Sequence, residues 1–340
     1  MKKFNLIIFL FLWIMAGSAQ AVTFTAQRLP DRFSAMALNN RGQIVGPLYS
    51  EDWSSFHAAI WDQGNLTDLG TLEGVGSSNA TDINDNGQII GYSSTTSGYG
   101  HYFFYENGTM TDIGRYQAKA LNDMGTVLVY ASYNNSFFTW NKGSGLSSRL
   151  GYGQPEDINN NGQITGTNNS KTFIWDPTTG MQEVFGMIGA GINDSGHIAI
   201  NNFESGTMAY MAYLWKSDSD YQNLGTLGGT GSSARAINDS DWIVGRSETA
   251  AGEWHTFLWI DGTMYDLNDL VMNLDDTVVL NDVLDINDSG QILTFDYLLT
   301  PVSETPVPVP STVVLLMSGL AFIGVSRKHK LTRIKNNHDS

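Results

Sequence analysis

One phrase decides the fold, and its first copy reads Ala37-Leu38-Asn39-Asn40-Arg41-Gly42-Gln43-Ile44-Val45-Gly46. Six similar copies follow, with their central asparagines at Asn84, Asn122, Asn159, Asn193, Asn238 and Asn287. Successive copies are 45, 38, 37, 34, 45 and 49 residues apart, and a period in this range is typical of a solenoid, a propeller or another array. A unit of this size cannot bury its own hydrophobic face, so neighbouring units must share the core.

A second, aromatic phrase lies between the copies of the first. It reads His57-Ala58-Ala59-Ile60-Trp61 and His255-Thr256-Phe257-Leu258-Trp259 in two of its copies. A third phrase follows after a turn, as in Asn65-Leu66-Thr67-Asp68-Leu69-Gly70. These short runs are rich in β-branched and aromatic residues, and Asn-Asp-x-Gly, Asn107-Gly108 and Asp261-Gly262 separate them with turn signals. Four antiparallel strands per unit, repeated radially, predict an all-β fold, a β-propeller.

The ends of the repeat predict how the ring closes. Residues 234–267 contain four predicted strands, whereas the seventh copy is followed by one more strand at Tyr297-Leu298-Leu299 and lacks a fourth. The segment from Val22 to Leu29 precedes the first copy and has no blade of its own. We therefore expect seven four-stranded blades, with this N-terminal strand completing the last one and removing two open edges. Six or eight blades are the alternatives, because the 34-residue step is short and the last steps are long.

Residues 1–21 have the pattern of a secretory signal peptide. Lys2-Lys3 precedes an apolar run from Leu6 to Met15, and Ala19-Gln20-Ala21 matches an A-x-A cleavage site. Cleavage by signal peptidase after Ala21 would export the repeat domain, residues 22–301. An uncleaved anchor is the alternative, although the apolar run is short for a membrane span.

Composition excludes several classes of function. The chain has no cysteine, so disulfides, thiolate metal sites and a cysteine nucleophile are absent. Between the signal peptide and the basic C-terminal tail, 11 Lys+Arg stand against 33 Asp+Glu, a net charge of −22. Such a surface repels nucleic acid and favours solvation or divalent cations. Stability must come from a large shared core.

The C-terminal segment has a different composition. Residues 302–310 form a proline-rich spacer that ends in Pro308, Val309 and Pro310. Residues 311–330 combine an apolar run with a basic stop at Arg327 and Lys328, and the 19 residues from Val307 to Val325 are just long enough to cross a bilayer. We expect a transmembrane helix, with residues 331–340 as a cytoplasmic tail and the repeat domain outside.

Two resemblances follow from these phrases. The Ile-Asn-Asp-x-Gly-Gln-Ile and His-Thr-Phe-Leu-Trp phrases, with Leu224-Gly225-Thr226-Leu227-Gly228-Gly229, resemble bacterial extracellular HAF repeats over 22–301. The C-terminal segment resembles a PEP-CTERM sorting signal, with Pro308-Val309-Pro310 in place of Pro-Glu-Pro and ten further residues after Lys330. The second resemblance implies that an exosortase cuts an inner-membrane precursor, in a bacterium that makes exopolysaccharide, and leaves the mature form at the cell surface or outside the cell.

Recurring side chains are predicted to be scaffold. His57, His101 and His255 share one repeat position, which favours a strand-end or inter-blade hydrogen bond over catalysis. Trp61, Trp140, Trp175, Trp215 and Trp259 recur in register, which favours core packing. Trp53, Trp242 and Trp254 fall outside that register, so we expect them to be exposed and able to stack on a sugar.

Three copies resemble the start of a calcium loop. They begin at Asp82, Asp157 and Asp285, but the acid that such a loop needs eleven positions later is present only as Asp296, where Ser93 and Asn168 stand in the other two. A capped β-turn explains the phrase without metal, and calcium is the alternative. No residue is assigned to a metal or cofactor site.

The sequence shows no catalytic constellation. Four acids interrupt the repeat, at Glu51, Asp52, Asp275 and Asp276, without a motif around them. We therefore expect an exported, non-enzymatic propeller that acts as a surface or extracellular-matrix interaction protein associated with exopolysaccharide. The alternative is a polysaccharide-active enzyme, a hydrolase or a lyase, with its site on the central face of the propeller.

Overall fold

The asparagine-centred phrase forms the turn between the first two strands of each blade. In its first copy, β2 (Ala37–Leu38) pairs antiparallel with β3 (Ile44–Tyr49), and the Gly42 N–H donates to the Asn39 carbonyl at 3.0 Å. Gly42 has a φ of 78°, a backbone conformation that glycine adopts readily and that residues with a Cβ adopt at an energetic cost. The phrase therefore ends one strand and reverses the chain within a few residues.

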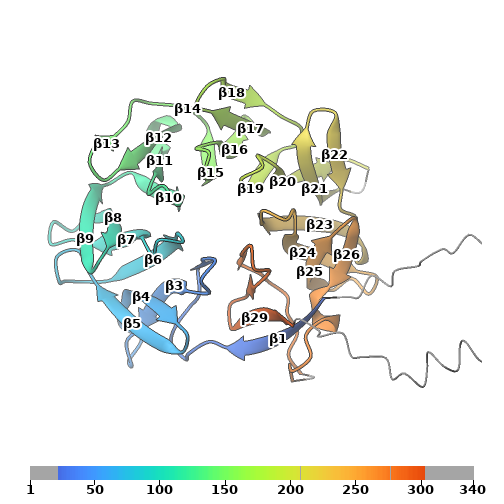
Figure 1. The fold of residues 1–340 in the computed structure, drawn as a ribbon, viewed down its shortest axis with the longest axis horizontal. Coiled ribbons are helices and arrows are strands. Elements are labelled where there is room, and N and C mark those ends of the chain that lie inside the picture. The colour runs from blue at the N-terminus through green and yellow to red at the C-terminus, as the bar shows by residue number, and fades with distance from the viewer. Residues whose placement is uncertain (1–21, 207, 276, 303–340) are drawn as a thin grey trace, which may run out of the picture. The chain divides into compact units, whose positions relative to one another are not determined.

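The computed structural model describes residues 22–302 except 207 and 276, and this part of the chain forms seven sheets arranged in a ring (Figure 1). Residues at the inner ends of all seven sheets line a central channel. The first blade holds β2, β3, β4 (Phe56–Asp62) and β5 (Asn65–Gly70). The second holds β6 (Ser78–Ile83), β7 (Ile89–Ser94), β8 (Gly100–Glu106) and β9 (Thr109–Gly114). The third holds β10 (Gln117–Leu121), β11 (Val127–Ala131) and β12 (Ser136–Asn141), with the short β13 (Gly145–Leu146) and β14 (Gly151–Tyr152) both on β12.

The fourth blade holds β15 (Gln154–Ile158), β16 (Ile164–Asn168), β17 (Lys171–Asp176) and β18 (Gly180–Glu183). The fifth holds β19 (Ile188–Ile192), β20 (Ile198–Glu204), β21 (Ala209–Ser217) and β22 (Asp220–Asn223). The sixth holds β23 (Gly228–Ile237), β24 (Ile243–Thr249), β25 (Trp254–Ile260) and β26 (Thr263–Asp266). Two 3-10 turns, η1 (Ser132–Asn134) and η2 (Leu267–Asp269), interrupt this pattern.

The seventh blade joins the two ends of the described chain. Its strands are β27 (Asp285–Ile286), β28 (Ile292–Leu293), β29 (Tyr297–Val302) and, outermost, β1 (Thr23–Arg28). In Figure 1 the blue β1 lies beside the orange β29. The Phe24 N–H also donates to the Leu270 carbonyl at 2.8 Å, which ties β1 to the segment after η2. The predictions of seven blades and of closure by the N-terminal strand are confirmed.

The core lies between the blades, as the repeat predicts. One cluster joins Val45 and Ala58 of the first blade to Ile83, Ile89 and Phe103 of the second, and comparable clusters follow around the ring. The in-register tryptophans belong to this core: Trp61, Trp140, Trp215 and Trp259 are buried and Trp175 is half-buried. The short spacing of 34 residues between Asn159 and Asn193 still accommodates a complete blade. The fourth blade is compact, because its strands β16 and β17 are joined by Asn169 and Ser170 alone.

The predicted segments at the two ends of the chain lie outside the described residues. These are the signal peptide up to Ala21, the proline motif Pro308-Val309-Pro310, the apolar span and the basic stop at Arg327 and Lys328. Within residues 22–302, no helix has the length and apolar character needed to cross a membrane.

Candidate functional site

The seven central asparagines form a closed inner ring at one mouth of the channel, which we call the turn face. Each Nδ2 donates to the main-chain carbonyl of the corresponding asparagine in the next blade, over 2.8–3.0 Å. Each Oδ1 accepts the N–H four residues further on, which caps its own turn. All seven side chains are buried. The asparagine therefore fixes both the turn and the contact between blades, and neither oxygen nor nitrogen is left for a ligand.

The next residue of each phrase forms an outer ring on the same face. Each backbone N–H donates to Oδ1 of its counterpart in the next blade over 2.7–2.8 Å, through Asn40, Asp85, Asp123, Asn160, Asp194, Asp239 and Asp288. The two asparagines also bridge the carboxylates on either side of them. This ring lines a cavity of about 180 Å³. Burial, and then the charges of Asp288 and Asp194, raise the pKa of Asp239 above its ordinary value.

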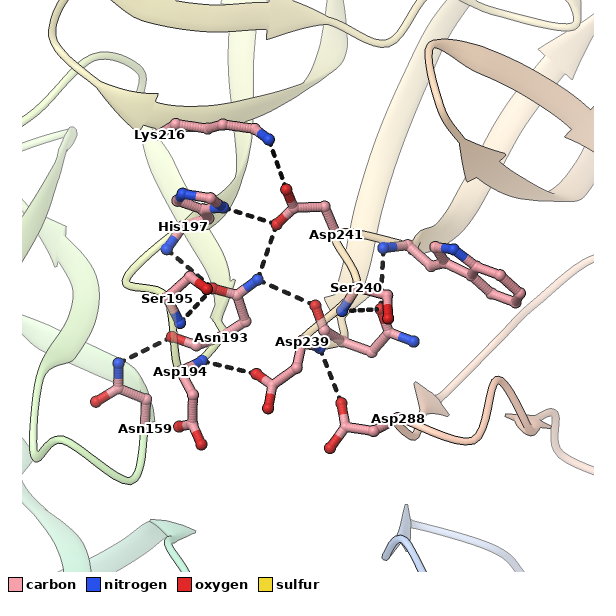
Figure 2. Close-up of polar contacts among 12 residues, drawn as sticks. Asn159, Asn193, Asp194, Ser195, His197, Lys216, Asp239, Ser240, Asp241 and Asp288 are labelled. Atoms are coloured by element: carbon pink, nitrogen blue, oxygen red, sulfur yellow. Dashed lines mark hydrogen bonds and ion pairs between the residues drawn. The ribbon is translucent and has the colours of Figure 1, made fainter.

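The fifth and sixth blades carry a variant of this contact (Figure 2). Asp241 replaces the glycine of the other copies and keeps a positive φ of 61°. Its carboxylate accepts from the Asn193 amide at 2.9 Å, pairs with His197 Nδ1 at 2.7 Å and with Lys216 Nζ at 2.6 Å. Partial burial opposes ionisation, but the hydrogen bonds from Lys216 and His197 lower the pKa of Asp241 overall. One aspartate against six glycines at this position was the sequence signal for this contact.

The three aspartates of the calcium-like phrases clamp neighbouring blades together. Asp82, Asp157 and Asp285 each accept the N–H of the next blade's inner strand, at Leu121 (2.7 Å), Ile192 (3.0 Å) and Leu38 (3.0 Å). Each also accepts the N–H of the residue that follows it. Each carboxylate therefore has two donors from the protein, and linking the blades gives the phrase a role that needs no metal. Among the described residues, no group of three or more His, Asp or Glu side chains is arranged to hold a metal ion.

These aspartates act on one another through their charges. Protein surrounds them, although each keeps some contact with solvent. Burial, and then the charges of Asp285 and Asp157, raise the pKa of Asp82 well above its ordinary value. Burial also raises the pKa of Asp157, and it raises that of Asp285 to about 7. The carboxylates therefore take up protons more readily than exposed aspartates do.

The recurring histidines pair with aspartates of the adjacent strand in their own blade. His57 lies 2.9 Å from Asp68, His101 lies 2.7 Å from Asp112, and His255 lies 2.6 Å from Asp266, each through Nδ1. The expected strand-end hydrogen bond is therefore present, within a blade and not between blades. Because the same pair recurs in three blades, its role is structural.

A groove opens at the other mouth of the channel, where the inner strands begin. It consists of two adjacent cavities, of about 460 Å³ and 570 Å³, which share Arg246 and Asp282 in their linings. The first reaches into the channel mouth as far as Arg235 and is flanked by Phe295. The second runs outward along Trp254 and His255. The groove thus lies mainly on the fifth to seventh blades.

An aromatic ring and a guanidinium group meet in this groove. Trp254 is 43% exposed, and the Arg246 guanidinium carbon lies 5.4 Å from the centroid of its ring. The β24–β25 register places Arg246 opposite Thr256, which brings it diagonally onto Trp254. Among residues 22–302 apart from 207 and 276, neither Arg246 nor Arg235 has an ion-pair partner. The groove therefore holds two guanidinium groups that no carboxylate of the described residues pairs with directly.

The three out-of-register tryptophans have different positions. Trp254 lies in the groove, whereas Trp53 is 63% exposed in the loop between β3 and β4, where its ring packs 5.1 Å from that of Tyr49. The expectation of exposure is wrong for Trp242. That residue takes the glutamine position of the turn and packs against the hydrophobic core beside Gly290, because a bulky ring there fills the space between the sixth and seventh blades.

Two of the four acids that interrupt the repeat, Asp52 and Asp275, are loop caps, and Glu51 lies exposed in a turn. Asp52 accepts from the Ser50 and Ser54 hydroxyls at 2.7 Å, and these hydrogen bonds lower its pKa to about 2. Asp275 accepts from Thr277 in the same way, which lowers its pKa. Asp276 lies outside the described residues. A low pKa makes Asp52 and Asp275 poor general acids at neutral pH.

Comparisons with known proteins extend the fold assignment. No protein-family model matches this chain, and neither does any curated protein. Among solved structures, the chain is similar to virginiamycin B lyase from Staphylococcus aureus, with a TM-score of 0.54 and 8% identity over 83% of this chain and 100% of that one. A streptogramin B lyase structure gives 0.52 and 12% over 82% and 98%, and YCF48 bound to a D1 peptide gives 0.54 and 12% over 85% and 98%. At such identities the likeness concerns the fold alone, a β-propeller.

Proposed function

We propose that this chain is an exported, non-enzymatic β-propeller that binds an extracellular polymer, an exopolysaccharide, through the groove. The observation that carries the proposal is the half-exposed Trp254 beside the unpaired Arg246. An indole face offers a flat apolar surface, and a guanidinium offers several fixed donors next to it. Large apolar contact combined with a few convergent polar groups is the usual character of a ligand site.

The contacts of the titratable groups favour binding over catalysis. His255, the histidine in the groove, forms the same pair with an aspartate that His57 and His101 form in blades without this groove. A base oriented for catalysis is expected to be particular to one site, whereas the aspartate contact is repeated. The groove adds only a contact of 3.7 Å between His255 Nε2 and the exposed Glu253 carboxylate. A polysaccharide hydrolase or lyase on this face is the alternative, and the same experiment tests it.

The test compares two exposed tryptophans. The full-length chain is titrated with exopolysaccharide purified from the producing cells and applied to a glycan array. Trp254→Ala is expected to weaken polymer binding at least about tenfold, which corresponds to about 1.4 kcal/mol. Trp53→Ala, the matched control on a different blade, is expected to bind as the unmodified chain does. Equal binding by both variants would refute the groove as the binding site.

The same samples test for turnover. The polymer is recovered after incubation, and its size distribution and reducing or unsaturated ends are measured. We expect neither to change. Shortening of the polymer that disappears on substitution of an acid in the groove would replace the binding role with the enzymatic one.

We also propose that the precursor is anchored in the inner membrane by residues 311–330 and then released by an exosortase near Pro308-Val309-Pro310. The supports are the signal peptide, the apolar run and the basic Arg327-Lys328 stop. Mass spectrometry of the C-terminal peptide, from the envelope and from the medium, tests this. A mature surface fraction that ends at Ser340 would leave a plain membrane anchor instead.

A further inference from the structure

We infer that the groove binds an uncharged sugar unit, whose hydroxyls bridge Arg246 and Asp282 while its ring stacks on Trp254. This inference rests on the proposed function, because it names the class of polymer that the groove takes. It is argued from the charges that line the groove, from the hydrogen-bonding groups left unused there, and from the charge of the whole domain.

The charges that line the groove cancel. Arg235 and Arg246 supply two positive groups, while Asp282 lines both cavities and Glu253, whose carboxylate lies 3.7 Å from His255 Nε2, lines the outer one. The remaining acid of the inner cavity, Glu156, is already paired with Lys119 at 3.0 Å. A site built for a carboxylate or sulfate is expected to carry an excess of positive charge. This groove does not.

The unused groups include both donors and acceptors. Asp282 Oδ1 accepts the Val283 N–H at 3.0 Å, and within the described part of the chain its other carboxylate oxygen has no hydrogen-bond partner. Arg246 supplies donors only. A sugar hydroxyl both donates and accepts, so neighbouring hydroxyls can satisfy the carboxylate and the guanidinium together. An anionic substituent could satisfy Arg246 but would be repelled by Asp282.

The net charge of the whole domain also favours an uncharged ligand. The part of the chain between the signal peptide and the C-terminal basic tail carries a net charge of −22. A polyanion approaching any face meets this charge at low ionic strength, which slows association and weakens binding. A neutral polymer does not meet that cost, so its binding should depend little on salt.

The experiment separates polymers by charge. Exopolysaccharide from the producing cells is fractionated by anion exchange into a neutral and an acidic pool, with dextran and alginate as defined probes of each class. Binding of the full-length chain is measured at low and high sodium chloride. We expect the neutral pool to bind, with less than about a twofold change in Kd across the salt range, because uncharged ligands are insensitive to screening.

Asp282→Asn is the deciding variant, because asparagine keeps an oxygen for the Val283 N–H and removes the charge. If the ligand is neutral, this variant weakens binding by about tenfold or more, since a charged acceptor is lost. If the ligand is acidic, it tightens binding, since a repulsion is lost. Arg246→Gln is expected to weaken binding in either case, and it verifies that the groove is the site.

The outcomes distinguish the two proposals. Binding of the acidic pool that needs Trp254, falls steeply with salt and improves in Asp282→Asn would overturn the neutral ligand and leave the proposed function intact. Binding of neither pool, or binding indifferent to Trp254→Ala, would overturn both.

Discussion

The two mouths of the central channel differ in how their polar groups are used. On the turn face, seven asparagines and the residues that follow them satisfy one another in two closed rings. In the groove, Arg246 contacts the Trp254 ring but has no ion-pair partner among the described residues, one oxygen of Asp282 has no hydrogen-bond partner there, and Trp254 is partly exposed. Polar groups that recur in every blade hold the fold together. Some that occur once, such as Asp241, do the same, whereas those in the groove keep positions that the proposed ligand would use.

Both faces depend on the closed ring, so opening it should have the largest effect. Deletion of residues 22–29 removes β1 and with it Phe24, which is fully buried in the core of the last blade. We expect loss of cooperative unfolding for the whole domain, measured by differential scanning calorimetry. Phe24→Ala is the graded control and should cost about 3–5 kcal/mol. Unchanged thermal unfolding of the deletion variant would contradict closure by β1.

A single substitution in the inner ring should separate stability from binding. Asn159→Ala removes the donor to the Asn193 carbonyl and the acceptor of two turn N–H groups. Buried groups left without a partner cost about 1–3 kcal/mol each, so we expect a loss of about 2–4 kcal/mol in the free energy of unfolding, measured by urea titration. Polymer binding by the folded protein should persist. Trp254→Ala should weaken polymer binding and leave the free energy of unfolding unchanged. If either variant lost both stability and binding, the two faces would not have separate roles.

The clamping aspartates predict how stability depends on pH. The pKa of Asp285 is about 7 in the folded chain, above its ordinary value of 3.8. The folded state therefore holds the proton more tightly than the unfolded state, and stability falls as pH rises from about 4 to 7. We expect the unmodified chain to unfold more easily at pH 8 than at pH 5, measured by urea titration at each pH.

Asp285→Asn isolates this contribution. The variant cannot ionise at this position, so its stability should fall less between pH 5 and pH 8 than that of the unmodified chain. Loss of the Asp285 charge also removes part of what raises the pKa of Asp82, which reduces the pH dependence in the same direction. Contributions from groups that do not interact with Asp285 are common to both proteins and cancel in the comparison. An equal pH dependence in the two proteins would mean that the Asp285 carboxylate does not carry the effect.

The smallest expected effect concerns calcium. Asp82, Asp157 and Asp285 already accept two N–H groups each, so addition of calcium or of EDTA should leave the unfolding temperature unchanged. A site occupied at a hundred times its Kd would stabilise the fold by about 2.7 kcal/mol. A shift of that size, abolished by Asp157→Asn, would restore the calcium interpretation of the phrase.

The sequence predicted what depends on local pattern. Blade number, the turn at each central asparagine, the core tryptophans and the closing role of residues 22–29 all follow from repeat spacing and strand periodicity. The hydrogen bond between Asn39 and Asn84 could not be predicted in this way, because it depends on how two neighbouring blades are offset along the axis of the ring. The groove was missed for the same reason, since Arg235, Arg246 and Asp282 lie in different strands and loops. Trp242 was misplaced because an out-of-register residue can fill a gap in the core as well as face solvent.

The position of β1 in the last blade has a consequence for the order of events during synthesis. The strand β1 is synthesised first but cannot pair until its partner β29, which ends at Val302, has been synthesised last. Until then, six blades can assemble in sequence while two strand edges stay unpaired. Such edges invite pairing with other chains. The interval between completing the sixth blade and docking the N-terminal strand is therefore when this protein is most exposed to aggregation, and a partner that shields that strand would act then.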